Sequence, residues 1–306
     1  MRVALIGGTG FVGGYLVDAL IESGHEPSLL VRSGSEAKLN RANQCRIITG
    51  SLSNQKSIEE TVDGCDAVIY NVGILREDRR RGSTFEAMQY AGVTSVVKAA
   101  KDAGIKRFLL MSANGVSVPG TPYQETKFRA EQHVKQSGLA YTIFRPSVIF
   151  GDPRGKIEIA TQLCQDMICT PIPAIGFHTG LRASTGAVMM SPVWVKDVAD
   201  AFVRSLDNPS AVAKEYELGG PQEISWTEII ECIARTVGKK KLILPMPIAV
   251  MKVGATLLDW IPAFPVTRDQ LTMLAQGNTA PDHHLRALIE RDPAPFTPET
   301  LSYLRD

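Results

Sequence analysis

The chain has no surplus of either charge. Among its 306 residues, Lys and Arg together number 33 and Asp and Glu number 32, so the formal net charge is +1. Proteins that bind nucleic acid through its phosphates usually carry a clear basic excess. The balance therefore argues against a nucleic-acid partner.

Cysteine and histidine are scarce. The five cysteines form no C-x-x-C pair, and neither they nor the five histidines have the spacing of a metal site, so we expect no metal. An odd number of cysteines without a secretory signal favours reduced thiols in a cytosolic compartment. The cysteines are Cys45, Cys65, Cys164, Cys169 and Cys232.

Long apolar runs are also missing, since none reaches the roughly 18 residues of a transmembrane helix. A strand pattern begins at Val3, which leaves no room for a targeting segment. We therefore expect a cytoplasmic protein. Residues 245–262, with Lys252 and Asp259 as their only charges, leave alternatives open. They pack on the protein's own core, or they meet a hydrophobic ligand or the inner face of a membrane.

The first fourteen residues combine an apolar strand pattern, spaced glycines and a helix pattern. In such a unit, backbone N–H groups at the helix N-terminus can bind a pyrophosphate. Gly7 and Gly10 permit the sharp turn and the approach of phosphates, and Gly13 permits the helix to pack closely on the strand. The G-x-x-G-x-x-G spacing is one residue longer than the usual dinucleotide fingerprint, but its context supports nucleotide binding. The predicted contacts of the turn are Gly7, Thr9, Gly10, Phe11, Val12 and Gly13.

Strand and helix patterns alternate through the first half of the chain. This alternation predicts an α/β fold with a Rossmann-type, doubly wound parallel sheet covered on both faces. Beyond Gly151 the prolines cluster and the spacing becomes irregular. We therefore predict a nucleotide-binding domain over 1–150 and a smaller, mixed substrate lobe over 151–306, partly interleaved with the first. Strands are expected at 3–6, 27–32, 46–50, 66–71, 107–112 and 141–145, with helices including 57–62, 84–103 and 123–137.

Tyr123 and Lys127 lie four residues apart on a predicted helix and so share one face. A nearby ammonium lowers the pKa of a tyrosine, which could then exchange a proton while a nicotinamide exchanges a hydride. The same lysine could bind a ribose. Ser112, at the end of the fifth predicted strand, is a third catalytic candidate that would orient a carbonyl or hydroxyl. Ordinary bonding to backbone is its alternative, and Asn114 is the second candidate for that position.

The end of the second predicted strand indicates the type of cofactor. An acidic residue there would bind the ribose hydroxyls of NAD. The chain has Arg32 and Ser33 instead, and a guanidinium with a hydroxyl suits a 2′-phosphate. We therefore predict NADP(H), with NAD(H) less favoured; a solvated surface arginine is the alternative reading. Asn71, Val72 and Gly73 form a small, open strand end at which we expect the cofactor's ribose.

Four arginines gather in the loop after the fourth predicted strand. Glu77 and Asp78 dilute them, which favours a solvated loop. The alternative is a site for an anionic substrate group or a partner. The arginines are Arg76, Arg79, Arg80 and Arg81.

The glycine turn, Ser112, the Tyr123/Lys127 pair and residues 145–151 resemble the extended or atypical branch of the short-chain dehydrogenase/reductase superfamily. Within it, the chain is similar to the nucleotide-binding accessory subunit of mitochondrial complex I and its bacterial relatives. The matching segments are 72–75, 84–87, 192–199, 218–221 and 265–270.

The resemblance implies tightly held NADP(H), which in the respiratory complex is structural. It adds Ser51, Leu52, Pro146 and Ser147 to the expected cofactor contacts. Ser51 follows the third strand where an acidic residue is usual, and Gln89 stands where the long helix usually has an asparagine.

Two classes of function follow. The first is an NADP(H)-dependent oxidoreductase, or a nucleotide-sugar epimerase or dehydratase. The second is a structural or assembly protein of a respiratory or membrane-associated complex that holds NADP(H) tightly. Apolar residues of the second lobe favour a small hydrophobic substrate such as a quinone-like or other carbonyl compound. These residues are Phe177, Met189, Met190, Trp194 and the stretch 245–262.

Overall fold

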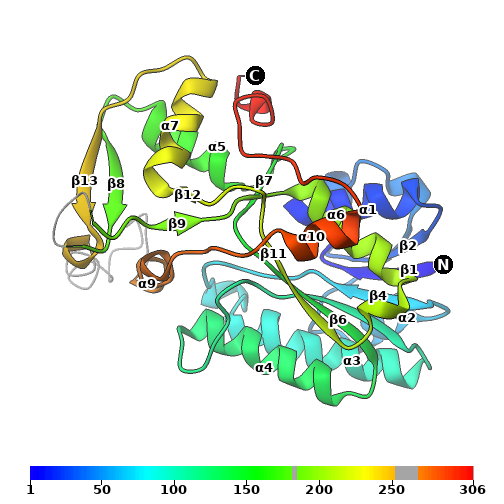
Figure 1. The fold of residues 1–306 in the computed structure, drawn as a ribbon. Helices are drawn as coiled ribbons and strands as arrows, with labels where there is room; N and C mark the ends of the chain where they lie inside the picture. Colours follow the sequence, from blue (N-terminus) through cyan, green and yellow to red (C-terminus); the bar gives the residue numbers. More distant parts are fainter. Residues whose placement is uncertain (181–184, 252–267, 306) are drawn as a thin grey trace. The chain divides into compact units, whose positions relative to one another are not determined.

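The computed structural model describes residues 1–180, 185–251 and 268–305 (Figure 1). The chain divides into two compact units. Unit 1 comprises Met1–Pro146, Val195–Tyr216 and Ala287–Glu290. Unit 2 comprises Ser147–Trp194, Glu217–Arg286 and Arg291–Asp306. Two segments that follow residue 150 in the chain thus return to unit 1.

Seven of the described strands form one sheet in the order β11-β6-β5-β4-β1-β2-β3. The pairs from β3 to β6 are all parallel. The strand order reverses between β1 and β4, so the carboxyl ends of these two strands flank the point where such folds bind nucleotides. The predicted doubly wound α/β fold is confirmed. The strands are β1 (Arg2–Ile6), β2 (Glu26–Val31), β3 (Arg46–Thr49), β4 (Ala67–Tyr70), β5 (Arg107–Met111), β6 (Ala140–Pro146) and β11 (Lys214–Leu218).

Helices cover both faces of this sheet (Figure 1). On one face, α2, α3 and α4 share a core with side chains of the strands. On the other, α1 and α6 pack against each other. Strands β4 and β5 are buried along their whole length, as expected for strands covered on two sides. The helices are α1 (Phe11–Glu22), α2 (Gln55–Val62), α3 (Gly92–Asp102), α4 (Pro122–Gln136) and α6 (Val195–Leu206).

The helix expected over 84–103 is not uniform. It begins with a π-helical segment, Glu86–Ala91, before α3. Within it, the Tyr70 hydroxyl donates a hydrogen bond to the Met88 carbonyl. A Cβ at Gly92 would lie 2.3 Å from that hydroxyl, so the helix can approach β4 only with glycine there. Apolar spacing cannot reveal the added residue of a π turn, which explains the difference.

Unit 2 has its own apolar core, built around α7 and the strands next to it. Three strand pairs belong to it: β7 with β10 (parallel), β9 with β12 (antiparallel) and β8 with β13 (parallel). Its elements are β7 (Ile149–Phe150), α5 (Ile159–Leu163), β8 (Ala174–His178), β9 (Met189–Met190), β10 (Val193–Trp194), β12 (Ile224–Ser225), α7 (Trp226–Thr236), β13 (Ile243–Pro247) and α9 (Arg268–Gln276), while α10 (His283–Ile289) spans the division of the units.

The apolar stretch 245–262 is only partly covered by the structure. Its first residues, 245–247, end strand β13, and residues 252–262 lie outside the described ranges. None of the described helices combines the length and the apolarity that crossing a bilayer would require. The five cysteines are free thiols.

Candidate cofactor and proton-transfer site

The glycine turn joins β1 to α1 with backbone alone. Gly7 has a φ of +98°, which side chains disfavour, and a Cβ there would lie 2.9 Å from the Asn71 carbonyl oxygen. A Cβ at Gly13 would lie 2.1 Å from the Gly7 carbonyl oxygen, so close packing of the helix requires glycine, as predicted. A Cβ at Gly10 would meet only the Gly7 oxygen, at an ordinary 3.5 Å. The fold therefore explains Gly7 and Gly13 but leaves Gly10 unexplained.

Helix α1 begins at this turn without an acidic group. Gly10 is the N-cap residue and has no side chain that could accept a hydrogen bond from the first turn. The first turn itself holds no carboxylate. A helix N-terminus of this kind presents N–H groups and a partial positive charge to an anion. Thr9 and Val12 are half-buried within the same turn, and Phe11 packs edge-on against Tyr15.

Arg32 and Ser33 follow β2 and are exposed. The Arg32 carbonyl accepts a hydrogen bond from the Ser35 N–H, which turns the chain directly after the strand. Among the residues that the structure describes, no carboxylate forms an ion pair with Arg32. Its guanidinium is thus available to an added anion, as the prediction of a 2′-phosphate requires.

The residues after β3 play different parts. The Ser51 hydroxyl lies 2.8 Å from the Ser53 hydroxyl, whereas Leu52 packs on the core beneath α3. Ser51 offers a hydroxyl at a strand end, and Leu52 offers apolar surface. Both remain predicted cofactor contacts.

The end of β4 connects the glycine turn to α4. The Asn71 N–H donates to the Ile6 carbonyl at 2.9 Å, which holds the ends of β4 and β1 together. Val72 packs on the core, and Gly73 is exposed. A Cβ at Gly73 would lie in ordinary contact with the Lys127 Nζ, at 3.7 Å, which places the lysine directly beside the strand end. Asn71–Gly73 and Lys127, predicted separately, are therefore brought together.

Helix α4 carries Tyr123 and Lys127 in its first half. Thr121 and Gln124 form a capping box, and Pro122 opens the helix, so its start is well defined. Lys127 is only 6% exposed, and its Nζ donates to the Met111 carbonyl at 3.1 Å. The Nζ lies 5.7 Å from the centre of the Tyr123 ring.

The pKa of Tyr123 is raised by burial of the phenol, so the expectation that Lys127 would lower it is wrong for this structure. The reason is that Lys127 is buried too. Burial lowers the pKa of Lys127 to about 8, although the charge of Glu131 partly opposes this. The ammonium also donates to the Met111 carbonyl. Removal from water therefore outweighs the attraction between ammonium and phenolate.

Ser112 makes a contact that the sequence did not suggest. Its hydroxyl donates to the carboxylate of Glu131, which is completely buried on α4. Arg145 on β6 binds the same carboxylate with two nitrogens, Nε at 2.9 Å and Nη2. Arg145 in turn pairs with Glu215 at 2.9 Å. In the sequence, Glu131 looks like an ordinary charged residue on a helix. The one signal of a partner is Arg145, in the strand that follows.

A small cavity of about 10 Å³ lies beside Lys127, about the size of one water molecule. Tyr70, Gln89 and Ser112 line it together with the lysine. Gln89 stands in the π-helical segment and is buried; its amide donates to the Ile74 carbonyl and accepts from Thr126. These two hydrogen bonds fix the side chain of Gln89, which stands where an asparagine is usual.

The remaining predicted positions lie at the end of β6 and after β4. Pro146 is buried, and its carbonyl accepts from the Asn114 N–H at 3.0 Å. Within unit 2, the Ser147 hydroxyl donates to the Asn278 carbonyl at 2.6 Å. The arginine loop is exposed, with ion pairs from Arg79 to Glu77 and from Arg81 to Asp78, which favours the solvated reading.

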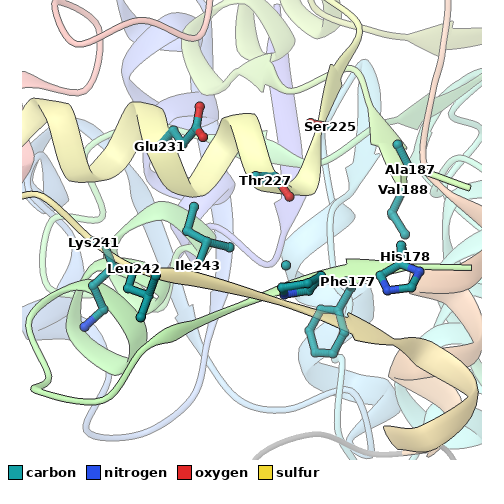
Figure 2. Close-up of a pocket in the computed structure, with 12 residues that line it drawn as sticks. Phe177, His178, Ala187, Val188, Ser225, Thr227, Glu231, Lys241, Leu242 and Ile243 are labelled. Atoms are coloured by element: carbon teal, nitrogen blue, oxygen red, sulfur yellow. The ribbon is translucent and has the colours of Figure 1, made fainter. Parts of the chain in front are cut away.

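Unit 2 contains a separate pocket of about 520 Å³, shown in Figure 2. Phe177 and His178 of β8 and Ile243 of β13 line it with Thr227 and Glu231 of α7. The lining is mixed, polar and apolar. Among the residues expected to favour a hydrophobic substrate, Phe177 and Met190 belong to the core of this unit and Trp194 packs against it. Phe177 also lines the pocket.

Known proteins place the chain in a family. Residues 7–166 match the model of a family described as NAD(P)H-binding. The chain belongs to this NAD(P)H-binding family. It is 27% identical over 253 residues to the photosystem II assembly factor Ycf39 of Synechocystis sp., which covers 82% of this chain and 72% of that protein. It is 26% identical over 260 residues to a ceramide reductase of Caulobacter vibrioides, at coverages of 84% and 78%.

The similarity to the complex I accessory subunit is confirmed as well. The chain is 26% identical over 289 residues to the mitochondrial NADH dehydrogenase (ubiquinone) 1 alpha subcomplex subunit 9 of Arabidopsis thaliana, at coverages of 90% and 68%. Among solved structures, the NADPH complex of the quinone oxidoreductase QOR2 from Escherichia coli superposes with a TM-score of 0.76, 17% identity and full coverage of both chains. The superposition shows the same fold, and the NAD(P)H-binding family is consistent with the predicted resemblance to the extended short-chain dehydrogenase/reductase branch.

Proposed function

We propose that this protein is an NADP(H)-dependent oxidoreductase that reduces a small hydrophobic carbonyl or quinone-like substrate. Tyr123 is the proposed proton donor, and Lys127 supports it and binds the cofactor's ribose. The bound nicotinamide supplies the hydride. The other residues bind and orient the cofactor: the glycine turn holds its pyrophosphate and Arg32 its 2′-phosphate.

The observation that carries the proposal is the buried Lys127. A lysine that is 6% exposed, has a pKa of about 8 and lies beside the open end of β4 costs stability. Strongly perturbed pKa values cluster at functional sites, where a titratable group is needed in spite of its cost. The arrangement with Tyr123 one helical turn away is what proton transfer next to a ribose needs.

Tyr123 is proposed to act as a proton donor in the direction of reduction. Because burial raises the pKa of the phenol, it holds its proton at neutral pH and can give it to a developing alkoxide. Ser112 donates to Glu131, so the phenol is left as the proposed donor to the substrate oxygen.

Three relatives support two different readings of the function. The Caulobacter vibrioides relative is named as a reductase of ceramide, a lipid, which favours an apolar substrate. The Synechocystis and Arabidopsis thaliana relatives are named as an assembly factor and as a subunit of a respiratory complex. The second candidate is therefore a protein that associates with such a complex and holds NADP(H) as a structural group.

One experiment separates the two. The nucleotide that co-purifies with the protein is identified, and the NADPH-loaded protein is mixed with prenylated quinones, long-chain ketones and nucleotide sugars. Loss of nicotinamide absorbance with an apolar member supports the oxidoreductase. A gain of absorbance when NADP⁺-loaded protein is mixed with a nucleotide sugar supports the epimerase-type alternative, because the sugar must first be oxidised. No reaction with any member, while the cofactor stays bound, contradicts the proposal and favours the structural role.

A further inference from the structure

The proton-transfer site is backed by a chain of paired charges that begins at a completely buried carboxylate. Glu131 has no exposed surface, yet it accepts from the Ser112 hydroxyl and from two nitrogens of Arg145. Beyond it, Glu215 joins Arg145 at 2.9 Å to Lys135 at 2.6 Å. A charge removed from water is costly unless its partners are well placed, so this carboxylate calls for an explanation beyond stability.

We propose that Glu131 is a positioning residue for the proton-transfer site: its carboxylate fixes the direction in which Ser112 donates and supports the Lys127 ammonium, while Arg145 holds it in place. This inference rests on the proposed function and adds a residue to it. Glu131 lies four residues after Lys127 on α4, so the two side chains share one helix face.

The bonding of Ser112 follows from chemistry. An ionised carboxylate only accepts hydrogen bonds, so the serine proton must point toward Glu131. The Ser112 oxygen then offers only lone pairs on its other side. It can accept a hydrogen bond from a hydroxyl, but it cannot donate one to a carbonyl.

The charge of Glu131 also acts on Lys127. Burial lowers the pKa of Lys127 to about 8, and the Glu131 charge opposes that lowering. The other titratable groups around the lysine are Tyr123 on the same helix and Tyr70 across the small cavity. Both phenols have raised pKa values and are neutral, so Glu131 supplies the negative charge that keeps Lys127 protonated near neutral pH.

Glu131→Gln tests this directly, because it keeps the shape and removes the charge. In NADP(H)-loaded full-length protein, the titration of Lys127 is followed by NMR of labelled lysine side chains. The signal is assigned with Lys127→Arg. We expect the midpoint to move at least one pH unit lower in Glu131→Gln, and to return toward the wild-type value in Glu131→Asp, which restores the charge.

A matched control is the ion pair between Arg129 of α4 and Glu86 of the π-helical segment. Glu86 binds Arg129 through two oxygens, like Glu131 and Arg145, but that pair is exposed. Glu86→Gln should leave the Lys127 midpoint unchanged, and Glu215→Gln should move it less than Glu131→Gln does. If Glu131→Gln fails to fold, the Lys127 midpoints of Glu131→Asp and Glu215→Gln are compared with that of the wild type instead.

Enzyme kinetics give a second, independent test of the role of Glu131. With a reducible substrate, Glu131→Gln should lower kcat at least tenfold with little change in KM, and should shift the basic limb of the pH profile downward. A lowered Lys127 midpoint supports the inference even if no substrate is reduced. An unchanged midpoint and pH profile in Glu131→Gln overturn it, even if the protein proves to be an active reductase.

Discussion

The glycine turn and the Ser112–Glu131–Lys127 cluster lie at carboxyl ends of strands in the same sheet, yet they are built by opposite means. The turn uses backbone alone, and its glycines remove side chains where atoms must approach. The cluster uses buried side chains: the Glu131 carboxylate accepts from Ser112 and Arg145, and Lys127 lies one turn away on the same helix. A site for a constant anion can be made from fixed dipoles, whereas proton transfer needs groups whose charge can change.

The largest expected effect comes from Gly13. Its Cβ would lie 2.1 Å from the Gly7 carbonyl oxygen, so Gly13→Ala should destabilise the fold by about 3 kcal/mol or more. A Cβ at Gly14 would meet no atom within 4 Å, and Gly14→Ala should be neutral or slightly stabilising. Chemical denaturation of both variants checks this. Equal stabilities would mean that the turn is not packed as described.

Gly10 separates the stability of the glycine turn from its proposed role in nucleotide binding. Since its Cβ position is open in the protein, Gly10→Val should leave the unfolding free energy nearly unchanged but abolish nucleotide binding. Calorimetric titration with NADPH, beside denaturation, measures both. Wild-type affinity in Gly10→Val would show that phosphates bind elsewhere.

Lys127 should make stability depend on pH. Its pKa is lowered from 10.5 to about 8, so between these values the unfolded chain binds a proton that the native protein does not, and stability rises with pH. The difference corresponds to about 3 kcal/mol. The stability of Lys127→Met relative to wild type should therefore fall by about that amount between pH 8 and 10.5.

Lys98 provides the control for this measurement. It is exposed and pairs with Asp102 on the surface of α3. Lys98→Met should not show this fall, because Asp102 raises the pKa of Lys98 and any pH effect there has the opposite sign. A flat difference for Lys127→Met would mean that the lysine is solvated in the native protein.

The smallest effect concerns cofactor choice. Arg32→Ala should weaken NADPH binding by about 2 kcal/mol, because it removes a charge-assisted contact to the 2′-phosphate. NADH binding should be unchanged. The exposed, paired Arg204 supplies a control in Arg204→Ala. Equal affinity of the wild type for NADPH and NADH would refute the role of Arg32.

The sequence predicted the backbone part of the site better than the charged part. The strand–turn–helix unit depends on residues within one short segment, and its glycines have the packing expected. That Asn71–Gly73 and Lys127 belong to one site was also predictable, because the carboxyl ends of parallel strands meet at one edge of a sheet. The identity of the family also followed from these motifs.

The features that could not be predicted from the sequence depend on contacts between residues far apart in the chain. Glu131 is bound by Arg145 of the next strand, and Arg145 by Glu215, far beyond it. Nothing in the helix pattern around Glu131 distinguishes it from a solvated charge. The direction of the Tyr123 pKa shift cannot be predicted from the helix pattern either, because burial of the phenol is a property of the folded core. The π-helical segment likewise depends on Tyr70 of β4.

The most direct test of the proposed chemistry is a single turnover with Tyr123→Phe. NADPH-loaded wild-type and variant proteins are mixed rapidly with an apolar carbonyl substrate, and nicotinamide absorbance is followed. Removal of the transferable proton should slow NADPH oxidation by about 10²–10⁴-fold, while the affinity for NADPH stays the same. Oxidation at the wild-type rate in Tyr123→Phe would contradict the account.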